Sequence, residues 1–332
     1  MRIAYFDIAK FIAMMMVILG HFGVPDINRF VYTFHIPLFF LLSGYFFKPY
    51  SSTIDLVKVK FRQLIIPYLL VGGVVIFIYI LKSLLAGLSF SDILLGVWNY
   101  FIGFLYGSGY INHVFGYKIT DIGPVWFCLA LFFGFIILNM LLQYKYQKTA
   151  LCIIFCIGYF STNYIWFPFS IQSAMTAVLF IYIGYKGKQY RIMDYHPSLG
   201  AVLPLLCIFS VGINIRSQFL IAHNYSEHLI TDIIVALAAS YLVLLYCRWL
   251  EQNTKTSKIM AFLGRYTIVM LCVHSVDVLI LPWNDYYKTA NTDATVIYVK
   301  LLITIFKFIL PIAMAYLVSK SPLMKRIFAL KV

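Results

Sequence analysis

The stretch LIIPYLLVGGVVIFIYILKSLL, residues 64–85, decides the fold class, because its 22 residues carry a single charge, on Lys82. An α-helix crosses a bilayer core of about 30 Å with roughly 20 apolar residues. Residues 64–85 therefore predict a transmembrane helix.

The composition of the whole chain excludes a soluble protein. Of 332 residues, 62% are hydrophobic and 11% are charged, whereas soluble domains carry about 25% charged residues. The same composition excludes intrinsic disorder, a collagen-like repeat and a disulfide scaffold. The six cysteines lie in apolar stretches and form no CxxC pair. They are predicted to be packing residues, and no metal site is expected.

Further apolar runs predict an all-α fold, a polytopic membrane helical bundle that forms one domain over residues 1–332. The ten predicted spans lie near residues 4–23, 30–47, 64–85, 124–143, 149–163, 170–185, 197–215, 228–249, 259–282 and 296–319. Another apolar stretch, 93–106, is interrupted by Asn99, Gly103 and the following Gly107. An interfacial or re-entrant segment is predicted there rather than a crossing.

The positive charges predict the orientation of these spans. The chain has 26 Lys and Arg against 12 Asp and Glu, a net charge of +14. If the N-terminus is cytoplasmic, 19 of the 26 basic residues fall on the cytoplasmic side, which is a positive-inside pattern. The other seven are Arg29, Lys82, Lys118, Arg216, Lys288, Lys300 and Lys307. Both termini are therefore predicted in the cytoplasm, and most of the positive excess is assigned to the orientation of the helices rather than to a ligand. Membrane lipids are expected partners, and nucleic acid is not.

Ionisable residues inside the first two spans are functional candidates, because each costs about 2.5–3.5 kcal/mol to insert. Asp7, Lys10 and His21 lie within about 60° of one another on a helix of 100° per residue. Asp7 and Lys10 are expected to pair near the cytoplasmic end. His35 begins the second span, and a short hairpin brings it toward His21 near the outer leaflet. A neutral imidazole there suits general-base chemistry.

Three further groups of residues leave two interpretations open. His274 has Asp277 three positions later, which fits either a structural polar pair or an active-site contributor. Lys58, Lys60 and Arg62 fit either phosphate binding or anchoring to anionic lipid headgroups. Tyr110 lies in a glycine- and aromatic-rich outer segment, residues 86–123, which suits either sugar stacking or anchoring at the membrane interface.

Taken together, these motifs resemble the acyltransferase 3 family of bacterial membrane acyltransferases. Asp7, Lys10 and His21 reproduce the spacing of its opening motif. His35–Gly44 resembles the second-span motif of the fucose O-acetylase-like branch. The basic run before Leu64 is similar to the family's third-span entry. Gly123–Phe127, Leu263–Tyr266 and His274 resemble its Trp-Phe start of the fourth span and its late LGR-to-His segment.

Two positions depart from the family pattern. Pro37 stands where much of the family has Asp, and Lys60 with Arg62 stands where it has paired arginines. The Ser43–Gly44 pair is predicted to serve helix packing.

The resemblance implies transfer of an acyl group, usually acetyl, from cytoplasmic acetyl-CoA to a sugar hydroxyl of a cell-envelope polysaccharide or lipid-linked glycan. It implies a multi-pass protein of the bacterial inner membrane that uses no metal. His21 would deprotonate the hydroxyl or carry the acyl group, with His35, Asp7, Lys10 and His274 as the other candidate catalytic residues. Lys58, Lys60 and Arg62 would bind the donor, and Trp126 and Tyr110 would contact substrate.

A transporter or exporter of glycan precursors is the alternative, with Asp7, Lys10 and the histidines as a proton path. Transporters usually show two related halves. The second half of this sequence has no counterpart of the His21–His35 hairpin, so the enzyme is favoured. The sequence does not specify an oligomeric state.

Overall fold

The structure, a computed structural model, describes residues 3–114, 116–252, 255–281 and 294–330, and it is 75% helical. The α-helices are α1 (Ala4–Gly20), α2 (Pro25–Val31), α3 (His35–Tyr45), α4 (Thr53–Lys60), α5 (Ile66–Leu85), α6 (Phe90–Tyr106), α7 (Trp126–Gln143), α8 (Gln147–Ser161), α9 (Ile171–Gln189), α10 (Leu199–Asn214), α11 (Leu229–Leu250), α12 (Thr256–Gly264), α13 (Thr267–Ile280), α15 (Ala294–Lys320) and α16 (Pro322–Ile327). A π-helical turn, η1 (Phe61–Ile65), joins α4 to α5, and 3₁₀ turns form η2 (Gly123–Val125) and η3 (Ile192–Asp194). The antiparallel strands β1 (Asn112–Val114) and β2 (Tyr117–Ile119) make one short hairpin.

The described residues support an all-α membrane protein. Four helical segments are long and apolar enough to cross a bilayer: Thr53–Leu85, Gly123–Gln143, Leu229–Leu250 and Lys300–Lys320. The bent pair α12 and α13 makes a fifth if the two helices form one span. Each of the ten predicted spans overlaps a helix, while ten crossings stay a prediction.

Three predicted segments differ from the structure. Residues 93–106 belong to one continuous helix, α6, which ends only at Gly107 with φ 70°, so the predicted interruption is wrong. Helix α6 is not among the helices long enough to cross a membrane, and its interfacial position stays a prediction. Its glycines do not break it, because Gly96 faces Tyr79 of α5 and allows the two helices to approach. The second predicted span is shorter than expected. A turn follows α2, and α3 starts at His35 and has 11 residues.

The third difference is a break in the ninth predicted span, residues 259–282. Helices α12 and α13 meet at an angle of 71° instead of forming one straight helix. A Cβ on Gly264, the last residue of α12, would lie 1.8 Å from the Asp7 carbonyl oxygen. The chain therefore turns where it touches the α1 backbone. The last residue of that span lies outside the described residues, as do Arg2, Lys288 and Lys331 of the charge pattern.

Helix α1 lies at the centre of the molecule and contacts α3, α11, α12 and α13. Helix α3 crosses α9 at close range: a Cβ on Gly44 would lie 1.9 Å from the Ile181 carbonyl oxygen. In return, a Cβ on Gly184 would lie 2.0 Å from the Leu41 carbonyl oxygen. These two glycines make the crossing possible, as expected for small residues between membrane helices.

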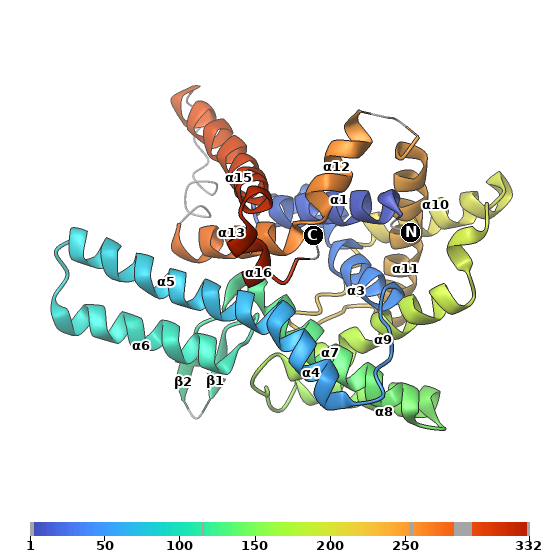
Figure 1. Ribbon diagram of the computed structural model, residues 1–332, viewed down its shortest axis with the longest axis horizontal. Helices are drawn as coiled ribbons and strands as arrows, with labels where there is room; N and C mark the ends of the chain where they lie inside the picture. The colour runs from blue at the N-terminus through green and yellow to red at the C-terminus, as the bar shows by residue number, and fades with distance from the viewer. Residues whose placement is uncertain (1–2, 115, 253–254, 282–293, 331–332) are drawn as a thin grey trace.

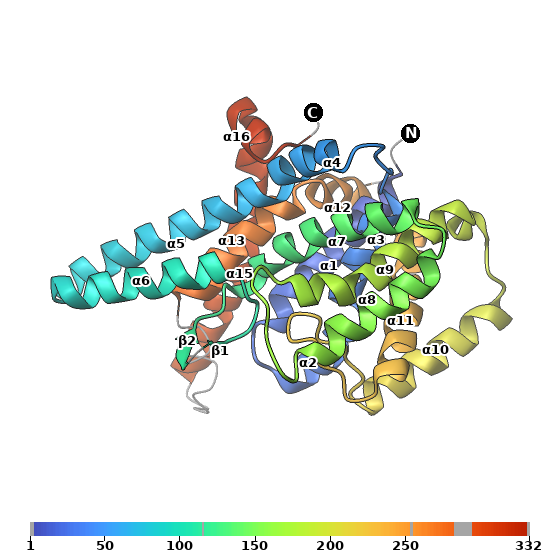
Figure 2. The same ribbon diagram turned by 90° about the horizontal axis from the view of Figure 1, so that it is seen from below.

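The outline of the molecule has two notable features. Helices α5 and α6 run side by side and project away from the other helices in both views (Figures 1 and 2). In Figure 2, α4, α12 and α16 lie toward one edge, while α2 and the β-hairpin lie toward the opposite edge. The three helices of the first edge carry basic residues, including Lys58, Lys258 and Arg326.

Candidate active site

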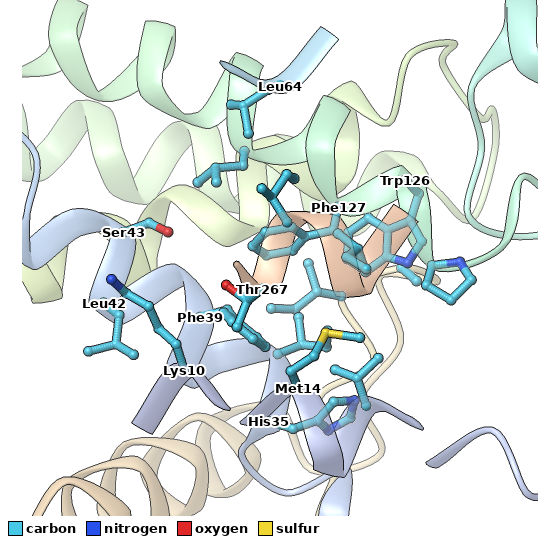
Figure 3. A pocket seen from close by; sticks show the side chains of 18 of the residues that line it. Lys10, Met14, His35, Phe39, Leu42, Ser43, Leu64, Trp126, Phe127 and Thr267 are labelled. Carbon is cyan, nitrogen blue, oxygen red and sulfur yellow. The ribbon is translucent and has the colours of Figure 1, made fainter. Parts of the chain in front are cut away.

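A cavity of about 680 Å³ runs through the helices around α1. It is lined by α1, α3, η1, α7, the 219–223 loop and the α12–α13 bend. Its polar lining includes Lys10, His21, Tyr32, His35, Ser43, Lys60, Gln63, Asp121, His223, Arg265 and Thr267. Figure 3 shows Lys10 and Ser43 at one side of the cavity and Trp126 at the other.

Three basic side chains, Lys10, Lys60 and Arg265, line what we call the basic end of the cavity. Asp7 holds two of them. Its Oδ1 lies 3.2 Å from Lys10 Nζ, and its Oδ2 lies 3.9 Å from Arg265 Nε. Asp7 itself is only 3% exposed, so it positions the two cations rather than facing the cavity. The predicted pairing of Asp7 with Lys10 is confirmed, and Arg265 joins it through the α12–α13 bend.

The basic run before the third span divides between the cavity and the surface. Lys60 lines the cavity, donates a hydrogen bond to Gln63 Oε1 at 3.2 Å, and lies 4.2 Å from the centre of the Phe135 ring. Lys58 and Arg62 are exposed and are not part of the lining. A donor-binding role for these three residues stays a prediction, and the geometry favours Lys60.

His21 and His35 line the opposite, histidine end of the cavity. Each imidazole Nδ1 lies close to the carbonyl oxygen four residues earlier: His21 to Val17 at 2.8 Å, and His35 to Val31 at 2.6 Å. A carbonyl oxygen can only accept, so Nδ1, the ring nitrogen that faces it, carries a proton in both histidines. In the neutral form of each ring, Nε2 is then the nitrogen that holds a lone pair and can accept a proton.

His274 connects His21 to a buried pair of charges. Its Nε2 lies 3.3 Å from His21 Nδ1, and its Nδ1 lies 3.9 Å from Asp277 Oδ2. The same Asp277 oxygen lies 3.8 Å from Lys307 Nζ. All three side chains are at least 95% buried, with exposed fractions of 0%, 5% and 2%. His274 therefore lies behind His21 and contacts it directly, which favours the active-site interpretation over an isolated polar pair.

The aromatic candidates differ in their relation to the cavity. Trp126 lines it directly. Tyr110 instead packs on His223, with ring centroids 4.5 Å apart, and His223 lines the cavity. The His223 side chain is exposed, and its partial desolvation lowers the pKa below its ordinary value of 6.5, although nearby Asp121 acts in the opposite direction.

The loop that carries His223 is held by a buried carboxylate. Asp232 of α11 accepts hydrogen bonds from the hydroxyls of Ser217 and Ser226, which lie on either side of the 219–223 lining segment. Thr176 of α9 donates a further bond to Asn224 Oδ1 at 2.6 Å. These contacts fix the 219–223 segment of the cavity wall.

Sequence reasoning missed three residues of this region as site candidates: Arg265, His223 and Lys307. Arg265 lies in the LGR motif, and Lys307 is an ionisable residue inside an apolar span, which is itself a functional signal. His223 has no distinguishing pattern around it. Among the residues that the structure describes, no group of three or more His, Cys, Asp or Glu side chains is arranged to hold a metal ion.

The arrangement can bind an anion at one end and remove a proton at the other. Comparison with known proteins gives one match: the model of the acyltransferase 3 family, described as an acyltransferase domain, covers residues 3–320. No curated protein and no solved structure matches the chain.

Proposed function

Because the chain belongs to the acyltransferase 3 family, we propose that it is an O-acetyltransferase that moves an acetyl group from acetyl-CoA to a sugar hydroxyl. The acceptor is a cell-envelope polysaccharide or a lipid-linked glycan. The protein lies in the bacterial inner membrane with both termini in the cytoplasm. The clustering of α4, α12 and α16 toward one edge of the molecule supports this orientation (Figure 2).

The observation that carries the proposal is that one cavity contains both the basic end and the histidine end. Lys10 and His21 lie eleven residues apart along α1, which corresponds to about 16 Å at 1.5 Å per residue. A donor with phosphates at one end and a reactive thioester on a long arm fits such a cavity. The phosphates lie at the basic end, and the thioester lies near the imidazoles.

The basic end supplies three cations to the phosphates of CoA. Lys60 and Lys10 provide ammonium groups, and Arg265 provides a planar guanidinium that can bind a phosphate through two hydrogen bonds. Asp7 keeps Lys10 and Arg265 on the cavity side of α1. It is a positioning residue, because its own carboxylate is buried away from the cavity.

The histidine end supplies the base. The acceptor hydroxyl oxygen attacks the thioester carbonyl carbon while His21 Nε2 takes the hydroxyl proton. The C–S bond then breaks, and His21 returns the proton to the departing thiolate, which leaves as the free thiol of CoA. The imidazole of His35 is oriented in the same way by the Val31 carbonyl oxygen. In this proposal it assists His21 as a second base in the same part of the cavity.

The proposal is tested with membranes that contain the protein, radiolabelled acetyl-CoA and the cell's own glycans. His21→Ala is compared with His228→Ala, because His228 is an exposed histidine at the start of α11. Loss of a general base costs about 10²- to 10⁴-fold in rate, so His21→Ala is expected to abolish detectable glycan labelling while His228→Ala retains it. Equal labelling in the two variants contradicts the role of His21. Absence of labelled glycan with the parent protein contradicts the acceptor class.

A further inference from the structure

A second, smaller cavity of about 230 Å³ adjoins the histidine end. It is lined by residues of α1, the following turn, α2, α13 and α15, among them Asn28, Leu281 and Lys307. His21 and Tyr32 line both cavities. The His21 imidazole therefore stands at the boundary between the two spaces, where it can touch a molecule in either one.

The size of the small cavity limits what it can hold. Its volume of about 230 Å³ corresponds to about eight water molecules at roughly 30 Å³ each. That is below the roughly 300–1,000 Å³ of pockets for drug-sized ligands. It suits a single ring of a hydroxylated molecule rather than a nucleotide or an acyl chain.

The charges around the small cavity favour a neutral ligand. Lys307 is 2% exposed, and its Nζ lies 3.8 Å from Asp277 Oδ2, so the ammonium charge is already balanced by a carboxylate. The ammonium group can still donate hydrogen bonds to a hydroxyl oxygen. A carboxylate or phosphate ligand would bring a second negative charge beside Asp277 and would be repelled.

Two other lining residues complement a hydroxylated ring. Asn28 Oδ1 is buried and has no hydrogen-bond partner among the described residues. Because Asn28 lines the small cavity, its amide can donate a hydrogen bond to a ligand hydroxyl and accept one from it. The hydroxyl of Tyr32 is engaged, since it donates to the Gly20 carbonyl oxygen at 2.8 Å. Its aromatic ring packs against His35, with ring centroids 5.1 Å apart, and also lines the small cavity, where it presents carbon surface to the C–H groups of a sugar.

We propose that this cavity, lined by His21, Asn28, Tyr32 and Lys307, is the acceptor site and holds one neutral sugar ring with a hydroxyl directed at His21. This inference rests on the proposed function, since it assigns the acceptor to one side of His21 and the acetyl donor to the other. It adds a specific selection: sugars without a carboxylate or phosphate on the acetylated ring.

The test measures occupancy of the cavity without any acyl transfer. Leu281→Cys places a thiol on the apolar wall of the small cavity, and Val24→Cys places one at an exposed position nearby as the control. The purified protein is treated with a small water-soluble methanethiosulfonate reagent, and labelling at each position is followed by peptide mass spectrometry. Methyl glycosides of glucose, galactose and mannose are the neutral probes, and methyl glucuronide is the anionic probe.

At least one neutral glycoside is expected to slow labelling of Leu281→Cys by about tenfold at ten times its Kd, while methyl glucuronide and the Val24→Cys control show no such effect. Adding Asn28→Ala is expected to remove the protection. The proposal is overturned if Leu281→Cys is not labelled, if no neutral glycoside protects it, if the glucuronide protects equally, or if Asn28→Ala leaves protection intact.

The outcomes separate this inference from the proposed function. Protection without glycan acetylation in the membrane assay refutes the enzyme activity but keeps the sugar site. Glycan acetylation without protection keeps the enzyme and refutes this cavity as the acceptor site.

Discussion

Two lysines two residues apart provide a sharp test of the donor end. Lys60 lines the main cavity, whereas Lys58 of the same helix is exposed to the outside. A helix rotates by 100° per residue, so the two side chains point about 160° apart. Substituting each by glutamine removes one positive charge from the same segment, but only Lys60→Gln removes it from the cavity.

The expected magnitude follows from the position of Lys60. A hydrogen bond to a charged group contributes about 1.5–3 kcal/mol. The lower value applies because Lys60 is half-buried and already contacts Gln63 and Phe135. A loss of about 1.5 kcal/mol raises the Kd for acetyl-CoA about tenfold. Lys58→Gln removes an exposed charge, with an expected effect of at most about twofold, or ~0.5 kcal/mol.

The assay is equilibrium binding of acetyl-CoA to the detergent-solubilised protein at constant ionic strength. Thermal unfolding of both variants controls for a loss of folded protein, and Lys60→Arg is expected to restore most of the affinity because it restores the charge. Equal weakening by Lys58→Gln and Lys60→Gln would refute the assignment, because it would mean that general surface charge binds the donor. Unchanged affinity in Lys60→Gln would refute it as well.

Three further predictions follow from named contacts. Gly44→Ala is expected to reduce the yield and thermal stability of the folded protein strongly, because its Cβ would lie 1.9 Å from the Ile181 carbonyl oxygen. Gly73→Ala is the control, because a Cβ there would have no atom within 4 Å. Equal melting temperatures of the two variants would contradict the close crossing of α3 and α9. Asp7→Asn is expected to destabilise the protein by about 2 kcal/mol, less than the roughly 3–5 kcal/mol of a fully buried pair because Lys10 and Arg265 reach water. Asp194→Asn, which breaks the exposed pair with Arg191, should cost under about 1 kcal/mol in the same denaturation measurement, and a larger loss there than in Asp7→Asn would reverse this ranking. His274→Phe removes the 3.3 Å contact with His21 and is expected to lower the transfer rate about tenfold, the equivalent of one hydrogen bond. The Kd for acetyl-CoA is expected to stay unchanged. A transfer rate equal to that of the parent protein would show that this contact has no catalytic role.

The sequence alone predicts those features that depend on residues close to one another in the chain. The apolar run of residues 64–85 gave its helix, the three-residue spacing of Asp7 and Lys10 gave their ion pair, and Gly44 gave a helix crossing. The helix and the ion pair depend on residues within one or two helical turns of each other. The helix crossing depends on the absence of a side chain at one glycine. The family, too, was indicated by short motifs at suitable spacing, and the family model covers residues 3–320.

Long-range contacts were not predictable in the same way. His274 meets His21 across 253 positions of sequence, and no periodicity of either helix specifies that encounter. Arg265 reaches Asp7 only because the chain bends by 71° after α12, whereas the apolar pattern of residues 259–282 suggested a straight span. The division between Lys58 and Lys60 depends on which face of α4 the other helices cover, which a basic run alone does not determine.

The contact of α1 with α12 also has a consequence for the order in which the protein is made. Asp7 and Gly264 are separated by 257 positions, which a ribosome adds in about 13–51 s at roughly 5–20 residues per second. Until then α1 holds Asp7 with Lys10 but without Arg265, and the main cavity lacks the wall formed by α13. During synthesis α1 therefore lacks its α12 and α13 contacts for most of that time, and the candidate active site is completed only when these late helices have been made.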